Sequence, residues 1–450
     1  MQSPGFRDTG SFVRPPARAA IHTPNSLSKL KRCLNPQSNI ALPIRIRGAG
    51  SASTDCNEST QGTVIRTTAL DRIVRIDAYN HTVTAEAGIR LGALVAALAS
   101  KGLELVGSHD QMERTLGGAL ASPCIGPGIG DQAGYLSSQL LNMKVVTVSG
   151  KVIPVSAEQQ HLLSAFRMSY GMLGVIYEAT LRVRPVSTFS ASHRSLSVNT
   201  FADVADRLSD RNIGLKIYVL PHRDRVYLDL RRYQAAPGNA YETPWRIKDW
   251  GESTVLPHVF KSLHRVMPIP AVRYKLIDSI TAATQGLVNS KLVTAGNNVA
   301  SAGRRRRDKP RNLLYSTWCF PATDFSIVIK AYVDFCRQKF QDNGYRCDMP
   351  AVGFRVSKDS SALLSPSFDE PVFALQTTST QQRGWDDFVI DLAQFAEKWG
   401  GTPLFNQTRA FRAEHALQAY STRLEFFRRI RHQLDPDKRL LNPFLAQCFG

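Results

Sequence analysis

The N-terminal part of the chain alternates between short apolar strands, polar turns and one apolar helical stripe. Residues 26–34 predict a short helix whose N-terminus is capped by Ser26. Apolar and polar positions then alternate through 63–68 and 74–88 around a polar turn, which predicts a β-hairpin. Residues 91–101 place their apolar side chains along one stripe and predict a helix. Strands, hairpin and helix together indicate an α+β unit.

The pattern continues with a second hairpin and a long strand. Residues 140–155 predict a hairpin with Ser149 and Gly150 at its turn. Residues 171–185 predict a buried strand that ends at Pro185. Because proline lacks a backbone N–H and ends a strand, we place the first domain boundary at this residue.

After residue 185 the sequence pattern changes to one that predicts antiparallel-type strands and amphipathic helices. Helices are predicted at 324–340 and 385–400 and should cover one face of a sheet. An irregular, basic insert is expected near 235–310, and the C-terminal tail predicts a helix to about Leu434, a proline-bearing turn and a final loop. The predicted strands are 216–221, 225–233, 313–321, 351–356 and 372–378.

Two segments consist mainly of small residues. The segment 43–55 runs from a strand into a turn in which Gly48 and Gly50 let the backbone approach a bulky ligand, with Ser and Thr hydroxyls beside freed amides. Such a loop can hold a pyrophosphate, although it has neither the Walker lysine nor the Rossmann glycine spacing. A plain Gly/Ser turn is the alternative interpretation. The second segment, 115–130, is too rich in Gly and Pro to predict a regular element.

Length and composition indicate a globular protein. A chain of 450 residues with 43% hydrophobic content predicts two or three domains. No apolar run is long enough to cross a bilayer and the start has no signal-peptide pattern, so we expect a cytoplasmic or membrane-peripheral protein. The seven scattered cysteines and dispersed histidines favour reduced thiols and no metal site.

The formal net charge of +19 admits nucleic acid, an anionic membrane or an anionic substrate as partners. The one dense basic run, Arg304 to Arg307, has no interleaved aromatic residues for base stacking, so we expect no nucleic-acid partner. A solvated loop is the first interpretation of this run. A docking patch for phosphate groups or acidic lipid is the second.

The chain resembles the vanillyl-alcohol-oxidase type of FAD flavoprotein, with its PCMH-type FAD-binding domain. The resemblance is carried by the two small-residue loops, the strand 83–88, the hairpin turn 147–152, the strand 174–183 and the terminal segment 435–443. Within that group the chain is most similar to the gulono-, arabinono- and galactono-lactone oxidases and the alditol oxidases. It also resembles the flavoenzyme that oxidises a polyprenyl-phosphate-linked ribose.

The resemblance implies an α+β fold in three parts. A two-subdomain FAD-binding domain would span 1–185, an α+β cap or substrate domain built on an antiparallel sheet would span 186–405, and 406–450 would return to the FAD domain. It also implies which residues contact FAD, and amide groups of a Gly/Ser turn suit that task. They are Arg47, Gly48, Ala49, Gly50, Ser51, Ala52 and Ser53 in the first loop, Thr115, Leu116, Gly117, Gly118, Ser122, Cys124, Ile125 and Gly134 in or near the second, and Ile176.

Two departures from the family pattern concern attachment of the cofactor. Many members carry a histidine in the first loop that bonds covalently to the flavin, and this chain has Ser51 there. A second histidine of the family is replaced by Ile125. We therefore expect noncovalent FAD, and we expect an electron acceptor other than oxygen because loss of the covalent link lowers the flavin potential.

The substrate side departs as well. Of the family's Glu-x-Arg pair, Arg355 is retained and Gly353 stands at the glutamate position, while Leu404 and Gln407 replace a histidine and a lysine. Arg355 is suited to stabilising negative charge on flavin or alkoxide, although a surface ion pair is its alternative interpretation. Gln407 can orient a hydroxyl group but cannot accept its proton, so the general base is unidentified.

Other candidates have competing interpretations. His109 and Asp110 are either a histidine general base with its carboxylate partner near the flavin or hydrogen-bonded residues of a loop. Cys124 is more typical of a small packing residue than of a nucleophile. Trp318 and Phe320 either wall a substrate cavity or pack in the core.

The resemblance implies an FAD-dependent oxidase or dehydrogenase that takes hydride from a CH–OH group of a sugar-, polyol- or lactone-like substrate. An FAD-binding protein with lost or altered catalysis is the alternative.

Overall fold

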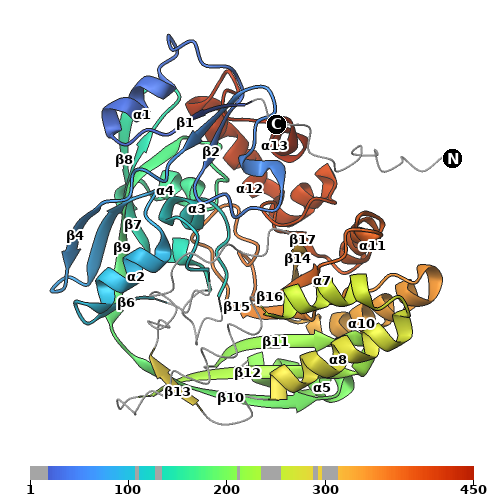
Figure 1. Cartoon of the computed structure of the whole chain (residues 1–450). Helices are drawn as coiled ribbons and strands as arrows, with labels where there is room; N and C mark the ends of the chain where they lie inside the picture. Colours follow the sequence, from blue (N-terminus) through green and yellow to red (C-terminus); the bar gives the residue numbers. More distant parts are fainter. Residues whose placement is uncertain are drawn as a thin grey trace.

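Two halves, each built around β-sheets, make up the part of the chain that the structure describes (Figure 1). The structure is a computed structural model, and it describes residues 19–106, 111–126, 134–209, 213–234, 255–286, 292–295 and 313–450. His109, Asp110 and the Arg304 to Arg307 run lie outside the described residues.

The N-terminal half contains two sheets. A small parallel sheet has the order β1-β3-β2, and an antiparallel sheet has the order β4-β5-β9-β7-β8 with β6 paired to β9. The strands are β1 (Ala20–His22), β2 (Ile44–Arg47), β3 (Thr63–Arg66), β4 (Ile73–Asp77), β5 (Thr82–Glu86), β6 (Leu103–Leu105), β7 (Leu140–Val146), β8 (Val152–Ser156) and β9 (Val175–Pro185).

The predicted hairpins are confirmed, with one correction. Strands β4 and β5 form the first hairpin, and β7 and β8 form the second around Gly150, whose φ is +75°. The segment 63–68, however, belongs to the other sheet, because β3 pairs in parallel with β1 and β2. Alternation alone marks a strand but does not identify the strand with which it pairs.

Within the described part of this half, four helices accompany the sheets: α1 (Leu27–Leu34), α2 (Leu91–Ala99), α3 (Leu116–Ala121) and α4 (Gln160–Phe166). Ser26 caps α1 as predicted, accepting a hydrogen bond from the N–H of Lys29 at 3.4 Å. The expectation of an irregular 115–130 segment was wrong where α3 forms. Thr115 caps this helix, and packing of its apolar face outweighs the low helix propensity of its two glycines.

The C-terminal half is built on an antiparallel sheet in which the described residues form eight strands, in the order β13-β10-β12-β11-β15-β16-β14-β17. All five strands predicted in this half are present. The strands are β10 (Thr188–Leu196), β11 (Gly214–Leu220), β12 (Arg225–Gln234), β13 (Leu292–Ala295), β14 (Leu314–Pro321), β15 (Ala351–Val356), β16 (Val372–Ser379) and β17 (Thr402–Pro403).

One face of this sheet is covered by α5 (Val198–Ser209), α10 (Phe325–Asn343) and α11 (Trp385–Lys398). Trp318 and Phe320 of β14 are buried in the core between the sheet and these helices, which corresponds to their core-packing interpretation. Val356 at the end of β15 instead joins the core of the N-terminal half. The opposite face of the sheet therefore looks toward the predicted FAD loops.

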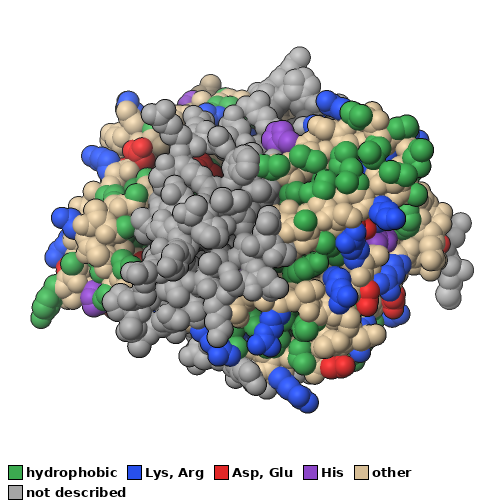
Figure 2. All heavy atoms as spheres, turned by 60° about the horizontal axis from the view of Figure 1, so that its bottom comes forward, with side chains coloured by type: hydrophobic (Ala, Val, Ile, Leu, Met, Phe, Trp, Pro, Cys, Tyr) green, Lys and Arg blue, Asp and Glu red, His purple; other side chains and the backbone are tan. Residues whose placement is uncertain are grey.

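The insert near 235–310 is not wholly irregular, because α7 (Leu256–Val266) and α8 (Pro270–Gly286) form a helical hairpin within it. Phe260, Tyr274 and Ile277 pack together on its inner side. The exposed basic residues and the prolines of this stretch concealed the apolar spacing of the inner face. The hairpin lies on the side of the molecule shown at the right of Figure 2.

The C-terminal segment returns to the N-terminal half. The helix α12 (Ala413–Leu434) is confirmed, but the predicted final loop was wrong, since α13 (Pro443–Phe449) forms there. Asn442 caps α13 by accepting the N–H of Leu445 at 3.0 Å. Leu445 and Phe449 are buried in the same core as α3. In the N-terminal half, strand β9 ends at Pro185. Short 3-10 turns are η1 (Asp55–Asn57), η2 (Leu136–Gln139), η3 (Ala157–Gln159) and η4 (Pro221–Arg223).

Candidate functional site: a cavity between two glycine loops

A cavity lies where the two small-residue loops meet the turn that leads into β9. It encloses about 780 Å³ not filled by protein atoms, part of it open to solvent. Its lining residues are Ile46, Gly48, Ala49, Gly50, Ser51, Ala52, Cys56, Asn57, Thr67, Ala87, Arg114, Thr115, Gly117, Gly118, Ala121, Ser122, Ser169, Tyr170, Gly171, Gly174, Ile176 and Asn406.

Glycine is required where the loops approach each other. A Cβ atom at Gly48 would lie 2.0 Å from Oγ1 of Thr115, and one at Gly117 would lie 2.9 Å from Cβ of Ala87. Gly50 has a φ of +71°, a conformation that residues with a side chain rarely adopt. The cavity wall is thus bare main chain over much of its extent.

Hydrogen bonds fix the first loop to distant parts of the chain. The hydroxyl of Ser53 donates to the carbonyl of Gln407 at 3.1 Å, and that of Thr54 donates to the carbonyl of Phe405 at 2.7 Å. Tyr315 of β14 donates its hydroxyl to the carbonyl of Ser51 at 3.0 Å. The Ser53 and Thr54 hydroxyls therefore hold the shape of the loop.

Arg114 fixes the second loop. Its guanidinium donates to the side chain of Gln111 at 2.9 Å, to the carbonyls of Gly118 and Pro123 at 2.9 and 3.2 Å, and to the hydroxyl of Ser122 at 2.6 Å. The side chain is buried, so these bonds are protected from water. Arg114 thereby clamps the two ends of α3 together at the cavity wall.

A buried arginine lies beneath both loops. Arg45 of β2 donates Nε to the carbonyl of Cys56 at 2.8 Å, and its two terminal nitrogens donate to the carbonyls of Leu440 and Tyr170. Complete burial lowers the pKa of Arg45 to about 10. One side chain thus joins β2, the first loop, the turn before β9 and the C-terminal segment.

Ten of the residues predicted to contact FAD line this cavity. They are Gly48, Ala49, Gly50, Ser51, Ala52, Thr115, Gly117, Gly118, Ser122 and Ile176. The predicted contacts at these positions stay predictions, but the structure brings the two loops together around one space.

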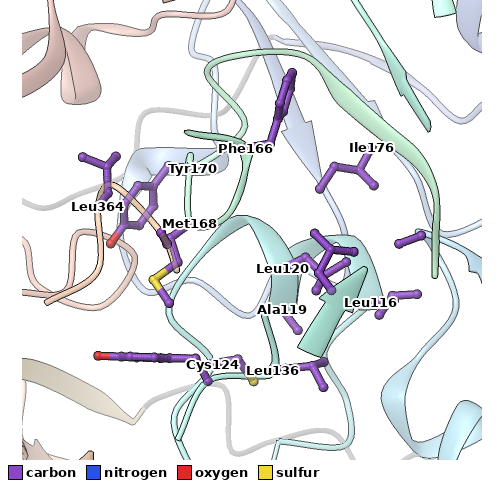
Figure 3. Packing of buried hydrophobic residues seen from close by; sticks show 14 of the residues in the cluster. Leu116, Ala119, Leu120, Cys124, Leu136, Phe166, Met168, Tyr170, Ile176 and Leu364 are labelled. Atoms are coloured by element: carbon purple, nitrogen blue, oxygen red, sulfur yellow. The ribbon is translucent and has the colours of Figure 1, made fainter. Parts of the chain in front are cut away.

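The other six predicted contacts do not line the cavity. Leu116, Cys124 and Ile125 are buried in the hydrophobic core, where Figure 3 shows Cys124 beside Leu136 below α3. Arg47 forms an ion pair with Glu58. Ser53 bonds to the 406–407 segment, and a Cβ at Gly134 would lie 3.3 Å from the side chain of Val356.

Several lining residues have no signal in the sequence. Asn406, Arg114 and the turn 169–174 are distant from the first loop along the chain, and only tertiary contacts bring them to it. The left-handed backbone conformation of Tyr170, with a φ of 50°, could not be predicted from the sequence either.

The shape and polarity of the cavity wall suit an extended cofactor that carries hydrogen-bond donors as well as phosphates. Main-chain groups and small side chains form the wall, and the Oδ1 atom of Asn406 is buried there with no hydrogen-bond partner among the described residues. A buried polar atom of that kind calls for a ligand or water partner. The cavity therefore fits FAD, as the loops predicted.

The substrate-side residues are arranged around β14. The hydroxyl of Thr317 donates to Oε1 of Gln407 at 2.6 Å, and both side chains are buried. The N–H of Leu404 donates to the carbonyl of Thr317 at 3.0 Å. The segment 404–408 is thus held between the first loop and β14 of the C-terminal sheet, with Gln407 at their junction.

Strand β15 explains the glycine at the family's glutamate position. A Cβ at Gly353 would lie 2.6 Å from Cγ1 of Ile217, inside the core covered by the helices. Alternation along a strand places Arg355 on the same face as Gly353 and opposite to Val356, which contacts Gly134. Neither Arg355 nor Gln407 is among the cavity-lining residues, so the cavity gives no support to the predicted catalytic role of either residue.

The described residues contain no group of three or more His, Cys, Asp or Glu side chains placed to hold a metal ion. Within the same residues, no helix has the length and apolar character needed to cross a bilayer.

Comparison with known proteins defines the class to which this fold and cavity belong. Residues 18–156 match the family described as FAD binding domain, and residues 179–448 match the family described as D-arabinono-1,4-lactone oxidase. The protein is an FAD-binding oxidoreductase. Since the second match spans more than half of the sequence, the chain belongs to the D-arabinono-1,4-lactone oxidase family.

Relatives and solved structures agree. The chain is 22% identical to L-gulono-1,4-lactone dehydrogenase of Mycobacterium tuberculosis over 96% of both chains. It is 24% identical to D-arabinono-1,4-lactone oxidase of Yarrowia lipolytica over 49% of this chain and 43% of the relative. Its fold is similar to that of cholesterol oxidase from Brevibacterium sterolicum, with a TM-score of 0.74, 13% identity and coverage of 96% and 94%.

These findings confirm the predicted fold class, the enzyme class and FAD as the cofactor. The noncovalent state of FAD stays a prediction.

Proposed function

We propose that this protein oxidises a CH–OH group of a sugar-1,4-lactone with noncovalently held FAD. The observation that carries the proposal is the meeting of two glycine loops around one cavity, in a chain whose remaining length matches the lactone oxidase family. The relatives named above are enzymes of gulono- and arabinono-1,4-lactones, which sets the substrate class proposed here.

Bound FAD supplies the chemistry of accepting a hydride from the carbinol carbon. The chain's own residues supply binding and orientation, which account for a large part of rate enhancement in such reactions. Main-chain groups around Gly48 and Gly117 line the binding cavity, while Asn406 offers an acceptor to the bound group.

Gln407 is the residue that we propose to orient the reacting hydroxyl. Thr317 occupies its Oε1 atom, so its amide NH₂ is the end left to donate a hydrogen bond. An amide cannot accept the hydroxyl proton, so that proton leaves to another base or to water. Like Gln407, Arg355 lies outside the cavity lining, and the catalytic roles of both residues stay proposals.

The mode of attachment follows from Ser51, which lines the cavity where many relatives of the fold carry a bonding histidine. A serine hydroxyl forms no such link, so we infer dissociable FAD and an acceptor other than oxygen. We divide the chain at 185 and 405, with 406–450 completing the FAD half. The cellular location, in the cytoplasm or at a membrane surface, remains a prediction from the sequence.

The test is anaerobic reduction. The purified flavoprotein is mixed with L-gulono-, L-galactono- or D-arabinono-1,4-lactone, or with a polyol, and the flavin absorbance is followed. Bleaching by a lactone supports the proposal, and re-oxidation by oxygen or by an artificial dye then separates oxidase from dehydrogenase.

A second function, FAD binding without turnover, is favoured by Gly353, Leu404 and Gln407, which replace polar residues of the family pattern. Full FAD occupancy with no bleaching by any lactone or polyol supports this alternative. Bleaching by a polyol alone moves the substrate class to the alditols.

A further inference from the structure

The α7–α8 hairpin exposes a group of large apolar side chains at its tip. Val266 is 79% exposed at the end of α7, Ile269 is 60% exposed in the turn, and Val272 and Leu276 of α8 are 51% and 37% exposed. Val272 and Leu276 are four residues apart, so they lie on one face of α8. Grouped exposed apolar side chains mark interaction surfaces, whereas isolated ones do not.

These side chains do not belong to the packing of the hairpin itself. Its inner side is held by Phe260, Tyr274 and Ile277, which are buried together. The tip is held rigidly as well, because Arg273 donates to the carbonyl of Met267 at 2.9 Å. The apolar tip is therefore presented outward on a fixed support.

The hairpin is also anchored to the cap domain by polar contacts. Arg346 pairs with Asp278 of α8 at 2.5 Å, and its guanidinium stacks over the ring of Tyr274 at 4.4 Å. His264 of α7 lies 3.1 Å from the buried carboxylate of Asp348. A loosely attached element would not carry this set of buried partners.

The α7–α8 hairpin carries mostly positive charge. Residues 255–286 contain the cations Lys261, Arg265, Arg273 and Lys275, and Asp278 is the single acidic residue among them. That carboxylate is already paired with Arg346. At the right of Figure 2, where α7 and α8 lie, hydrophobic side chains gather, with Lys and Arg side chains and a few Asp and Glu side chains beside them.

We propose that the tip of the α7–α8 hairpin, Val266, Ile269, Val272 and Leu276 with Arg265 and Lys275, docks onto an anionic lipid bilayer. Apolar side chains in the plane of the surface, flanked by cations that reach lipid phosphates, are the features that interfacial segments share. The occupant is a lipid surface because the cations repel a second copy of this chain, whose net charge is +19. The proposal does not depend on the lactone chemistry.

The experiment is co-sedimentation of the full-length flavoprotein with vesicles. Vesicles of phosphatidylcholine alone are compared with vesicles that also contain phosphatidylserine. The wild type is expected to partition onto the anionic vesicles and to be released by salt. The combined Val266→Ser, Ile269→Ser and Val272→Ser variant should lose about tenfold in partitioning.

Matched variants separate the tip from the general surface. Ile327→Ser on α10 and Val74→Ser on β4, at positions 56% and 55% exposed, should partition as the wild type does. Arg265→Gln with Lys275→Gln should lose about tenfold on anionic vesicles, and Lys29→Gln with Lys31→Gln on exposed positions of α1 should not. Unchanged FAD content in each variant shows that the fold is intact.

The proposal is overturned if the wild type binds no vesicle, or if the tip and control variants bind equally. It is also overturned if sedimentation velocity finds a dimer that the apolar triple variant dissociates while vesicles bind neither form. That last outcome assigns the tip to a second copy of the chain. Lactone turnover is a separate measurement, so the failure of one proposal is distinguishable from the failure of the other.

Discussion

Gly48 and Thr115 hold the two cavity loops in direct contact, since a Cβ atom at Gly48 would lie 2.0 Å from the Thr115 hydroxyl oxygen. The Gly48→Ala variant should therefore push the loops apart and lower FAD affinity by about tenfold or more. FAD content after gel filtration and titration of the stripped protein measure the effect.

The rescue variant is Gly48→Ala combined with Thr115→Gly. Glycine is tolerated at an N-cap at little cost, so α3 should persist while the steric conflict disappears. FAD affinity should then recover in large part. Undiminished FAD binding by Gly48→Ala alone would contradict the assigned contact.

Arg45 should be a determinant of stability. Replacing it by methionine leaves the carbonyls of Cys56, Tyr170 and Leu440 buried without their donor. The expected loss is about 3 to 5 kcal/mol in the free energy of unfolding, measured by urea denaturation. Arg75→Met, at an exposed position on β4, should change the same quantity by less than about 0.5 kcal/mol. Equal losses in the two variants would refute the anchoring role.

Protonation of His222 should oppose folding in mild acid. Burial, with Arg346 and Arg337 adding repulsion, lowers the pKa of His222 to about 3 from its ordinary 6.5. The unfolded chain therefore binds the proton more tightly, and stability falls as the pH drops from about 6.5 toward 3. The stability that wild type loses between pH 7.5 and pH 5 should exceed the loss in His222→Gln by about 1 kcal/mol, after discounting for partial exposure. Parallel pH profiles for the two proteins would show that His222 titrates normally.

The Thr317–Gln407 hydrogen bond should matter for turnover as well as stability. Thr317→Val leaves Oε1 of Gln407 without its donor, which costs about 1 to 2 kcal/mol and frees the amide to turn. We expect kcat/KM for the lactone to fall about tenfold with FAD content unchanged. The control is Thr377→Val on β16, which removes a similar buried bond to the hydroxyl of Tyr332 on the helix-covered side. A loss of kcat/KM as large in Thr377→Val would reduce the Gln407 contact to a structural one.

Much of the fold followed from local patterns. Strand alternation located the hairpins and five strands of the C-terminal sheet, because each of these strands buries one face against a core. Which strands pair with each other was harder to predict from the sequence. Strand β3, for example, pairs with β1 and β2 because of tertiary packing, which its own sequence does not reveal. The short helices α3 and α13 were missed because caps at Thr115 and Asn442, together with packing, overcome weak intrinsic propensity.

The candidate site was likewise predictable only in part from the sequence. Small residues at 48–52 and 115–118 identified the cavity wall, since a bare backbone is visible in sequence as glycine, alanine and serine. The roles of Asn406, Arg114 and Arg45 could not be predicted from the sequence, because an isolated polar residue gains its role only from the residues that fold against it. Cys124 was placed near the flavin by the family pattern, but its side chain packs in the core.

The most direct test of the account is the flavin stoichiometry of the purified chain before and after acid precipitation. Two loops of nearly bare main chain, with Ser51 in the first of them, predict about one FAD per chain and its complete release into the supernatant. Protein that takes up no FAD, or a precipitate that keeps its yellow colour, would contradict the central claim.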